Sequence, residues 1–563
     1  MKSGIKEAKT LGLELEHFVY DREMRLITYE QMAECLCEIA REVSAELLEE
    51  DGKVMGFASP GYVVTLEPGC QLEVSMEPDA DISALVHRYN TFREVADRVF
   101  GRYGFSLHEY AVFPLIQTGE MQIEEIGLLP KYRYDVMDRY FEKTGKYGRY
   151  MMRATAATQV SIDFSSEADA MKKVRVLQKI APIVALMAEN KVPAVNAKQW
   201  SGYLLRQQIW QSVDSQRCGY LQGSLQRGYS FDQYAEYVYE TAGLLVKTDG
   251  ALKALEGERV SAFYEGRELE DVPYLISMYF PVVRLKNYIE YRIADSMDIR
   301  RAERYLHFIE TIMYREPVLD ALDDMFAEVT DTKELYEAEQ ALICNGYEAV
   351  VYGKPVLKLI EEMFRILQKH AKDKMELLQG FFPVQMYRNL YCEAVRDKEE
   401  LHAQENTKIK DYLMQSTAKY HNRVVKTLYI PKLFTKKEIE IFTSVVETLY
   451  GIFDCVTEHY RSDAAYRKLF GFDARLEELI LLPPMYKTNI PMGRMDLFYD
   501  ENTGRFKFCE FNTDGASAMN EDRELNNAFR LSAAYDAFAK EIGCCTFELF
   551  DSWVEEVLCI WEE

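Results

Sequence analysis

Acidic side chains alternate with apolar ones in two short segments of the first eighty residues. Glu14 and Glu16 lie two apart in GLELEHFV, and Glu73 lies between Gln71 and Ser75 in TLEPGCQLEVSME, just after a Pro-Gly turn. Residues two apart in a β-strand point to the same face, so each segment gathers its polar side chains on one side. Three carboxylates from two strands suit a hard divalent cation such as Mg²⁺, which prefers oxygen ligands. The alternative is two ordinary edge strands with solvated glutamates.

A second acidic motif occurs far along the chain, in MGRMDLFYDENTGRFKFCEFNTDG. Arg494 and Asp496 are two apart, as are Glu510 and Asn512, and YDENTG (499–504) between them is a turn sequence typical of a hairpin. On paired strands the four side chains would share one face. Asp496, Glu510 and Asn512 are then candidate Mg²⁺ ligands, and Arg494 is a candidate phosphate contact. The alternative is an ordinary hairpin.

The composition limits the classes of partner and compartment. With 563 residues, 48% of them hydrophobic and 28% charged, the chain resembles a soluble globular enzyme of several domains. A formal net charge of −25 disfavours nucleic acid and anionic membranes as partners. The 11 cysteines show no zinc-ligand spacing. Because we find no signal peptide and no apolar run of about 18 residues, we expect a reduced cytoplasmic protein.

The pattern of predicted elements indicates an α+β fold. Strands with interspersed helices lack the regular alternation of a parallel α/β sheet. We expect a helix over 83–103 with a serine N-cap, long helices within 231–367, a helix over 436–460 and a strand over 479–482. Residues 376–427 are rich in Lys, Glu and Gln and have a helical pattern, so they are predicted to be a helical linker. The expected organisation is a first domain over 1–375, this linker, and a second domain over 428–563.

Five blocks, in order, resemble the plant-type glutamate–cysteine ligases. GLELEHFV (12–19) and LEPGCQLEVS (66–75) are similar to a GxExE…EPGGQxExS pattern, although Cys70 stands where the family has a second glycine. The likeness continues through 132–190 and in RQQIWQSVDSQRCG (206–219). The last block is FPVVRLKNYIEYRIADS (280–296), and the resemblance covers roughly residues 10–370.

This resemblance implies a fold, a reaction and a metal site. The fold is a glutamine-synthetase-like curved antiparallel sheet with helices. The reaction is an ATP- and Mg²⁺-dependent γ-glutamyl ligation, with Mn²⁺ as the alternative metal, in which ATP phosphorylates the γ-carboxylate of glutamate and the amine of cysteine attacks the acyl phosphate. The implied metal ligands are Glu14, Glu16, Glu73 and Glu290, with Glu67 as a further candidate.

The same blocks contain arginines suited to substrate carboxylate and phosphate groups. Arg292 lies two residues beyond Glu290, so a strand would place a guanidinium beside a metal-binding carboxylate. Each arginine could instead form a surface ion pair. By resemblance, Arg292 and Arg153 are the catalytic candidates, and Arg206, Arg217 and Gln159 are the candidates for binding substrate or phosphate.

Two nearby side chains are less informative. Lys286 could meet ATP phosphates or only solvent, and the sequence does not choose between these. His17 adjoins the first acidic strand but points to its opposite face, so we expect a structural role.

The second domain resembles the RxD…ExN core of glutathionylspermidine-synthase-like, circularly permuted ATP-grasp enzymes, over roughly 428–545. That family continues with lysines and a glycine-rich loop that hold ATP, whereas this sequence ends about fifty residues after Asn512. We therefore expect a partial module that is vestigial, truncated, or completed by another polypeptide.

The predicted function is formation of γ-glutamylcysteine from the small molecules glutamate, cysteine and ATP. Two alternatives stay open. One keeps the ligase chemistry with another amine acceptor, because no acceptor-pocket residue can be identified from the sequence. The other is a non-catalytic pseudo-ligase that serves as a binding or assembly module.

Overall fold

The computed structural model contains two compact units, Met1–Phe382 and Pro383–Glu563. It describes residues 1–192, 200, 202–248, 250–265, 267, 271–395, 399–420, 422–483, 486–501, 505–513, 518–547 and 549–562. Among these, no helix is both long enough and apolar enough to cross a membrane.

An antiparallel sheet organises the first unit. Its hydrogen-bonded order is β12-β13-β7-β1-β5-β4-β3-β2, and β6 also pairs with β1. The strands are β1 (Leu11–Asp21), β2 (Glu46–Glu50), β3 (Lys53–Ser59), β4 (Tyr62–Leu66), β5 (Leu72–Asp79), β6 (Phe105–His108), β7 (Ala157–Ile162), β12 (Val283–Leu285) and β13 (Ile289–Asp295). A mixed sheet-and-helix architecture was predicted, and the structure confirms it at that level.

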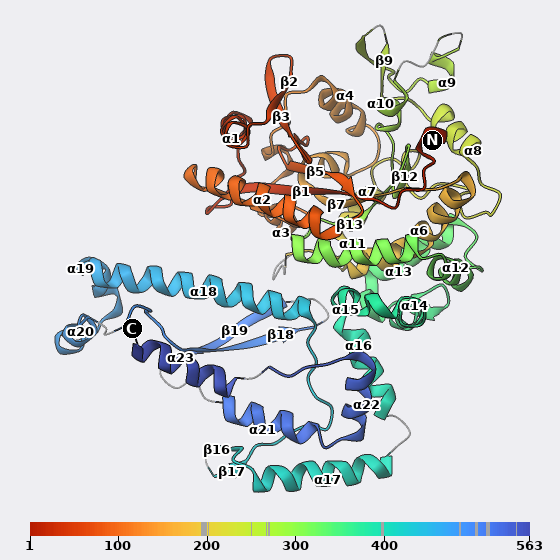
Figure 1. The fold of residues 1–563 in the computed structure, drawn as a ribbon. Helices are drawn as coiled ribbons and strands as arrows, with labels where there is room; N and C mark the ends of the chain where they lie inside the picture. The colour runs from red at the N-terminus through yellow and green to blue at the C-terminus, as the bar shows by residue number, and fades with distance from the viewer. Residues whose placement is uncertain are drawn as a thin grey trace. The chain divides into compact units, whose positions relative to one another are not determined.

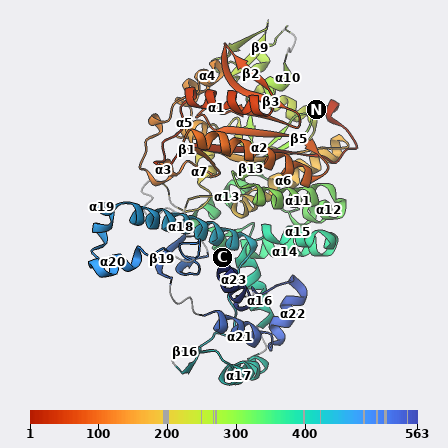
Figure 2. The same cartoon turned by 60° about the vertical axis from the view of Figure 1, so that its left-hand side comes forward.

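Three long helices cover one face of this sheet: α2 (Ile82–Arg102), α6 (Glu167–Met187) and α11 (Ile299–Tyr314) (Figure 1). They contact β5 and β6, β12 and β13, and β7, respectively, and the turned view in Figure 2 shows the same layer. The covered face is apolar because alternate residues of the central strands, such as Leu13, Leu15 and Val74, are fully buried there.

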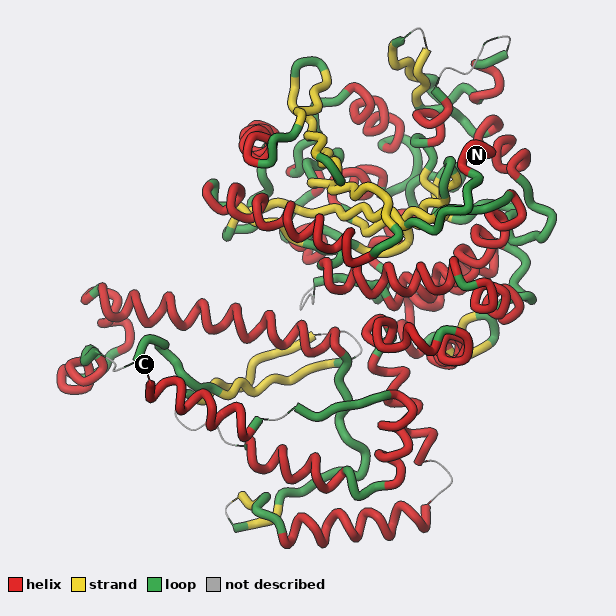
Figure 3. The backbone as a smooth tube through the Cα atoms, viewed as in Figure 1, coloured by secondary structure: helices red, strands yellow, loops and turns green. Residues whose placement is uncertain are grey.

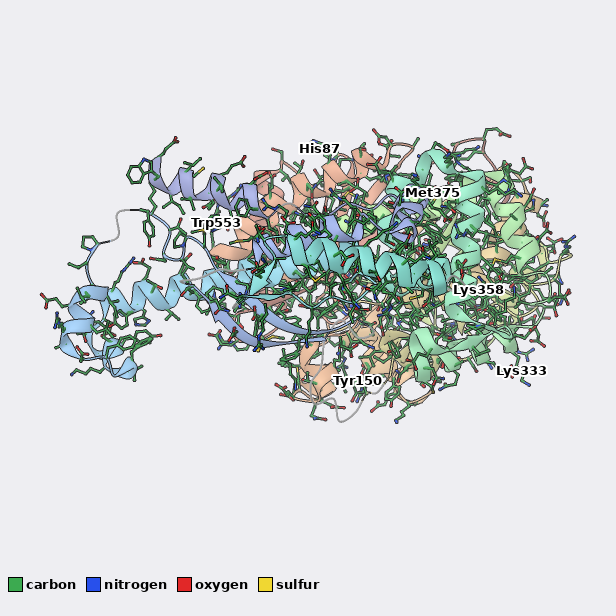
Figure 4. All side chains as sticks on the ribbon, turned by 90° about the horizontal axis from the view of Figure 1, so that it is seen from below. His87, Tyr150, Lys333, Lys358, Met375 and Trp553 are labelled. Atoms are coloured by element: carbon green, nitrogen blue, oxygen red, sulfur yellow. The ribbon has the colours of Figure 1, made fainter. Side chains whose placement is uncertain are left out.

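Other helices surround this core. They are α1 (Tyr29–Glu42), α3 (Pro114–Thr118), α4 (Tyr132–Phe141), α5 (Gly148–Ala154), α7 (Leu205–Gln211), α8 (Phe231–Glu240), α9 (Val260–Phe263), α10 (Val272–Ile276), α12 (Glu316–Met325), α13 (Thr332–Asn345), α14 (Val356–His370) and α15 (Met375–Leu378). Four two-residue strands and one short hairpin accompany them: β8 (Cys218–Gly219), β11 (Phe280–Pro281), β14 (Val350–Val351), β15 (Lys354–Pro355), and the pair β9 (Leu245–Thr248) and β10 (Ala251–Ala254). Lys333, in the first turn of α13, lies at the outer edge in Figure 4.

The second unit is mostly helical. It contains α16 (Val384–Val395), α17 (Glu399–Gln415), β16 (Lys419–Tyr420), β17 (Arg423–Val424), α18 (Lys436–Ser462), α19 (Ala464–Arg467), α20 (Ala474–Ile480), α21 (Met519–Phe529), α22 (Ala533–Ile542) and α23 (Phe550–Glu562). Its hairpin, β18 (Arg494–Asp500) and β19 (Arg505–Asn512), lies alongside α18 (Figure 3). Rings from the two elements touch, with Phe453 stacked on Phe511 at 4.4 Å between centroids.

The structure differs from the sequence-based elements in several places. α2 begins after Asp81, whose carboxylate accepts from the Ser83 backbone N–H at 2.9 Å, so aspartate and not serine is the N-cap. The predicted strand over 479–482 is wrong, because α20 occupies 474–480 and is capped by Asp473. Of the predicted linker, residues 376–382 belong to the first unit and the rest to the second, where α16 packs on α22 and α17 on α21.

Candidate active site

Strand register places the predicted carboxylates on one face of the sheet. Glu14 pairs with Gln159 of β7, and Glu16 pairs with Glu73 of β5. Glu290 of β13 pairs with Ser161 of β7, which itself pairs with a residue two positions before Glu14. Directly opposed residues of antiparallel strands point to the same side. The four predicted metal ligands therefore share the face opposite the one that α2, α6 and α11 cover, which we call the polar face.

Glu290 is the most heavily paired member of the polar face. Its carboxylate is fully buried and accepts from Arg284, from Lys286 Nζ at 2.9 Å and from Arg292 Nη1 at 3.2 Å. Burial alone would raise its pKa, but the three cations outweigh burial and hold the pKa well below its usual range. Glu290 is therefore a permanent anion held by three cations.

Glu14, Glu16 and Glu73 have the opposite balance of charge. Burial, followed by repulsion from neighbouring glutamates, raises the pKa of Glu14 and of Glu16 to about 8, and that of Glu73 to about 7. Glu67 is one of the repelling neighbours of both Glu16 and Glu73. Protein groups satisfy part of their hydrogen bonding: Glu16 accepts from the Gln159 amide at 2.8 Å, and Glu73 from the Thr65 hydroxyl at 3.1 Å.

This set of donors suits a hard cation. Burial first, and then repulsion among these glutamates and Glu67, raises three of their pKa values, and a bound divalent cation would offset both effects. Within the described residues, no three His, Cys, Asp or Glu side chains are placed to hold a metal as they stand. Glu16 and Glu290 accept hydrogen bonds from protein groups instead. The chemistry of the residues fits a divalent ion, and binding it requires some of these hydrogen bonds to be exchanged.

The Pro-Gly turn before β5 is fixed by backbone contacts. A Cβ at Gly69 would lie 2.3 Å from the Arg153 carbonyl oxygen, so only glycine fits there. Cys70, where the resemblance placed another glycine, takes a left-handed φ of 65°. Gln71 is buried and ties the turn to α5, accepting from Gly69 N at 2.8 Å and donating to the Thr155 carbonyl at 2.9 Å. Gln71 is therefore structural.

The structure does not bring Arg153 and Arg217 to the carboxylates. Arg153 pairs with Asp138 and donates to the Ile126 carbonyl at 3.1 Å, which ties α5 to α4. Arg217 is fully buried and pairs with Asp214 at 2.7 Å, with its guanidinium 5.0 Å from the Tyr140 ring centroid. Both guanidinium groups are occupied by protein partners.

Arg206 and Arg292 do lie beside the polar face. Arg292 donates to Gln159 as well as to Glu290, which joins β13 to β7. Arg206 is 3% exposed, donates to the backbone carbonyls of Arg292 and Ile293, and its charge partly opposes the rise in the pKa of Glu16. Both guanidinium groups lie within 6.0 Å of the Trp210 ring centroid. His17, as expected, is on the covered face, bonded to the Tyr89 hydroxyl at 2.7 Å.

Sequence reasoning missed Arg284 and left Lys286 open. The available signal was their spacing of two residues in a short apolar strand that precedes another strand with an acidic residue. Antiparallel pairing then sets Arg284 directly opposite Glu290. Both are members of the polar face.

Comparison with known proteins shows to which family the chain belongs. The model of glutamate–cysteine ligase family 2 (GCS2) matches residues 10–373. The chain belongs to this family. It is thus a ligase of the glutamate–cysteine ligase type, and its family match covers the sheet and every strand of the polar face.

Curated relatives agree with this assignment. The chloroplastic glutamate–cysteine ligase of Brassica juncea is 29% identical over 384 residues, which cover 66% of this chain and 72% of the relative. That of Arabidopsis thaliana is 28% identical over 383 residues, covering 66% and 71%. A solved structure of the glutamate–cysteine ligase of Francisella tularensis in complex with AMP aligns over 98% of both chains at 10% identity, with a TM-score of only 0.42.

The hairpin of the second unit, beyond the GCS2 match, also gathers its predicted residues. Arg494 pairs with Asn512 and Asp496 with Glu510 across β18 and β19. Arg494 lies 2.9 Å from Asp496 and 3.6 Å from Glu510, and the Asn512 amide donates to Glu510 at 3.1 Å. Residues 502–504 of the predicted turn lie outside the described residues. Because Glu510 is 56% exposed, this cluster is far more open than the polar face.

Proposed function

We propose that the first unit joins the γ-carboxylate of glutamate to the amine of cysteine at the expense of ATP, as the first step of glutathione synthesis. The observation that carries this proposal is the set of four glutamates on one sheet face, in a chain of the GCS2 family. A γ-carboxylate oxygen attacks the γ-phosphorus of ATP and ADP leaves. The amine then attacks the acyl carbon, phosphate leaves, and the amine loses a proton.

Glu14, Glu16, Glu67, Glu73 and Glu290 are the residues we propose to hold Mg²⁺, with Mn²⁺ as the alternative. The bound ion would neutralise charge on the phosphates of ATP during transfer. Support comes from the raised pKa values of Glu14, Glu16 and Glu73, since buried carboxyl groups that also repel one another are stabilised most by a bound cation.

The cations of β12 and β13 supply the other half of the chemistry. Arg284 and Lys286 anchor Glu290 and keep it ionised. Arg292 lies between Glu290 and Gln159, at the edge of the carboxylates, where its planar guanidinium can bind a carboxylate or phosphate through two hydrogen bonds. We propose Arg292 as the group that orients the transferring phosphate or the substrate carboxylate. We propose that Arg206 supports Arg292, to whose backbone carbonyl it donates a hydrogen bond.

The decisive experiment measures ADP release by the full chain with glutamate, Mg²⁺, ATP and a panel of amines. Release that requires both glutamate and cysteine, with γ-glutamylcysteine identified as product, supports the proposal. Release with another amine and not with cysteine would keep the ligase chemistry but change the acceptor. No glutamate-dependent release with any amine would indicate the non-catalytic alternative.

For the second unit we propose a partial ATP-grasp-like module whose exposed cluster around Asp496 and Glu510 can bind a divalent ion but turns over no ATP by itself. The support is the pairing of the four predicted residues on one hairpin face and their exposure. A truncated module, and a module that another polypeptide completes, are the alternatives to a vestigial one.

A further inference from the structure

A small pocket lies next to Arg292. It is lined by residues from α7, β11, β13 and α13, including Arg206, Trp210, Phe280 and Arg292, and on the α13 side by Glu339. About 30 Å³ of it admits groups the size of a water molecule, which is also the size of an ammonium group. The pocket thus combines two guanidinium groups, two aromatic rings and one carboxyl group.

Two polar atoms around this pocket have no partner in the described part of the protein. Arg206 Nε and Trp210 Nε1, from two residues that line the pocket, are buried without a hydrogen bond. A buried polar atom left unpaired destabilises the folded state, so such atoms are rare in folded proteins. Two of them in one small pocket indicate that a polar ligand or ordered water completes it.

Glu339 is the least expected member of this group. It lies in the middle of α13, is only 4% exposed, and forms no ion pair with any cation of the described chain. Burial raises its pKa to about 7, although the neighbouring Gln211 amide and Tyr220 hydroxyl act in the opposite direction. Glu337, two residues earlier on the same helix, is by contrast 65% exposed. A carboxyl group placed in this way lacks a cation.

We propose that this pocket binds the headgroup of an α-amino acid substrate, with Glu339 accepting hydrogen bonds from its ammonium group while Arg206 and Arg292 face its carboxylate. The proposal rests on the proposed ligase function, because it places an amino acid next to the polar face. The two guanidinium groups and the carboxyl group line one pocket, as the opposite charges of an amino acid headgroup require. Glutamate and cysteine share this headgroup, so either can be the occupant.

Ligand pairs that differ only by the amino group test this directly. L-glutamate is compared with glutarate, and L-cysteine with 3-mercaptopropionate, by calorimetric binding to the full chain with Mg²⁺ and a non-hydrolysable ATP analogue. These are measured for the wild type, Glu339→Gln and the control Glu337→Gln. Because binding and not product is measured, a failure of ligation itself is detected separately, by the ADP assay.

In the wild type we expect the amino acid of the occupying pair to bind at least tenfold more tightly than its deaminated analogue. Glu339→Gln should remove most of this preference, raising the Kd of the amino acid about tenfold or more and that of the analogue less than twofold. Loss of preference in the glutamate pair assigns the pocket to the γ-glutamyl donor, and loss in the cysteine pair assigns it to the acceptor. Glu337→Gln should behave as the wild type.

The proposal is overturned if Glu339→Gln weakens amino acid and analogue equally, since that result indicates a structural role, or if it changes neither. Should Glu339→Gln fail to fold, as judged by circular dichroism, Glu339→Asp replaces it. Aspartate keeps the charge but shortens the reach, so it should reduce the preference only in part. An unchanged preference in Glu339→Asp, or an equal loss for both ligands, would again count against the proposal.

Discussion

Glu16 of β1 and Glu73 of β5 are directly paired across an antiparallel ladder, with their carboxylates on the same face of the sheet. Like charges in this position destabilise a sheet, and here the charge of Glu73 adds to burial in raising the pKa of Glu16. A cation bound between the two carboxylates would therefore stabilise the folded sheet.

Glu73→Gln should reduce kcat/KM for ligation by at least about a hundredfold, because one formal charge is lost from the proposed metal site. The fold should stay intact, and its Tm should not fall, since the substitution keeps the volume and removes a repulsion. Steady-state kinetics at saturating Mg²⁺ and thermal unfolding measure the two effects. Glu77→Gln, at an exposed position of the same strand, is the control and should leave both unchanged. Near-normal turnover of Glu73→Gln would contradict the assigned role.

Mg²⁺ should raise the Tm of the wild-type chain in the absence of substrates, and a chelator should reverse this. Stabilisation by a ligand that binds only the folded state reaches about 2.7 kcal/mol at a hundred times its Kd. The shift should be much smaller in Glu14→Gln and in Glu16→Gln than in the wild type. Scanning fluorimetry at constant ionic strength checks this, with NaCl as the control salt. Equal shifts in all three proteins would place the ion elsewhere.

Arg284→Gln should destabilise the first unit by about 3–5 kcal/mol, because it removes one partner of a buried ion pair and leaves Glu290 short of positive charge. Chemical denaturation measures the loss. The matched control is Arg259→Gln, which breaks an exposed pair with Glu240 and should change stability little. If both substitutions had the same small effect, the buried pair would not hold β12 to β13 as inferred.

Asp496→Asn in the hairpin of the second unit should leave most of the ATP turnover with glutamate and cysteine, whereas Glu73→Gln should remove it. The reason is that Asp496 lies in an exposed cluster, and the proposed transfer occurs at the polar face. An ADP-release assay compares the two variants at equal protein concentration. Activity that is lost in Asp496→Asn and kept in Glu73→Gln would move catalysis to the second unit.

The Glu339→Gln variant should become increasingly more stable than the wild type as the pH rises from 5 to 8. The folded pKa of about 7 exceeds the ordinary value of 4.5, so the native state holds a proton that the unfolded state releases over this range. The contribution of Glu339 to the free energy of unfolding of the wild type therefore falls by up to about 3 kcal/mol as the pH rises. Glutamine does not titrate, so the variant lacks this loss. Denaturation at pH 5 and pH 8 measures it. Glu337→Gln should show the wild-type dependence, and an identical dependence in Glu339→Gln would exclude the raised pKa.

The local pattern of the sequence predicted the carboxylates but not their surroundings. Alternation with period two was enough to assign Glu14, Glu16 and Glu73 to strand faces, and the polar turn between Asp496 and Glu510 predicted the hairpin correctly, because these features depend on neighbours along the chain. The same local reasoning was wrong for 479–482, where a capping aspartate starts a helix over an apolar run that also suits a strand.

Register and burial were decided only by the tertiary structure. The opposition of Glu16 and Glu73, and that of Arg284 and Glu290, depends on pairing between segments far apart in the sequence, and a slip of one residue would turn each side chain to the other face. The sequence likewise does not distinguish Glu339 from Glu337, since both lie in an acidic helix. Packing of α13 buries only the first, and burial without a cation is what makes that carboxyl group a candidate ligand for an amine.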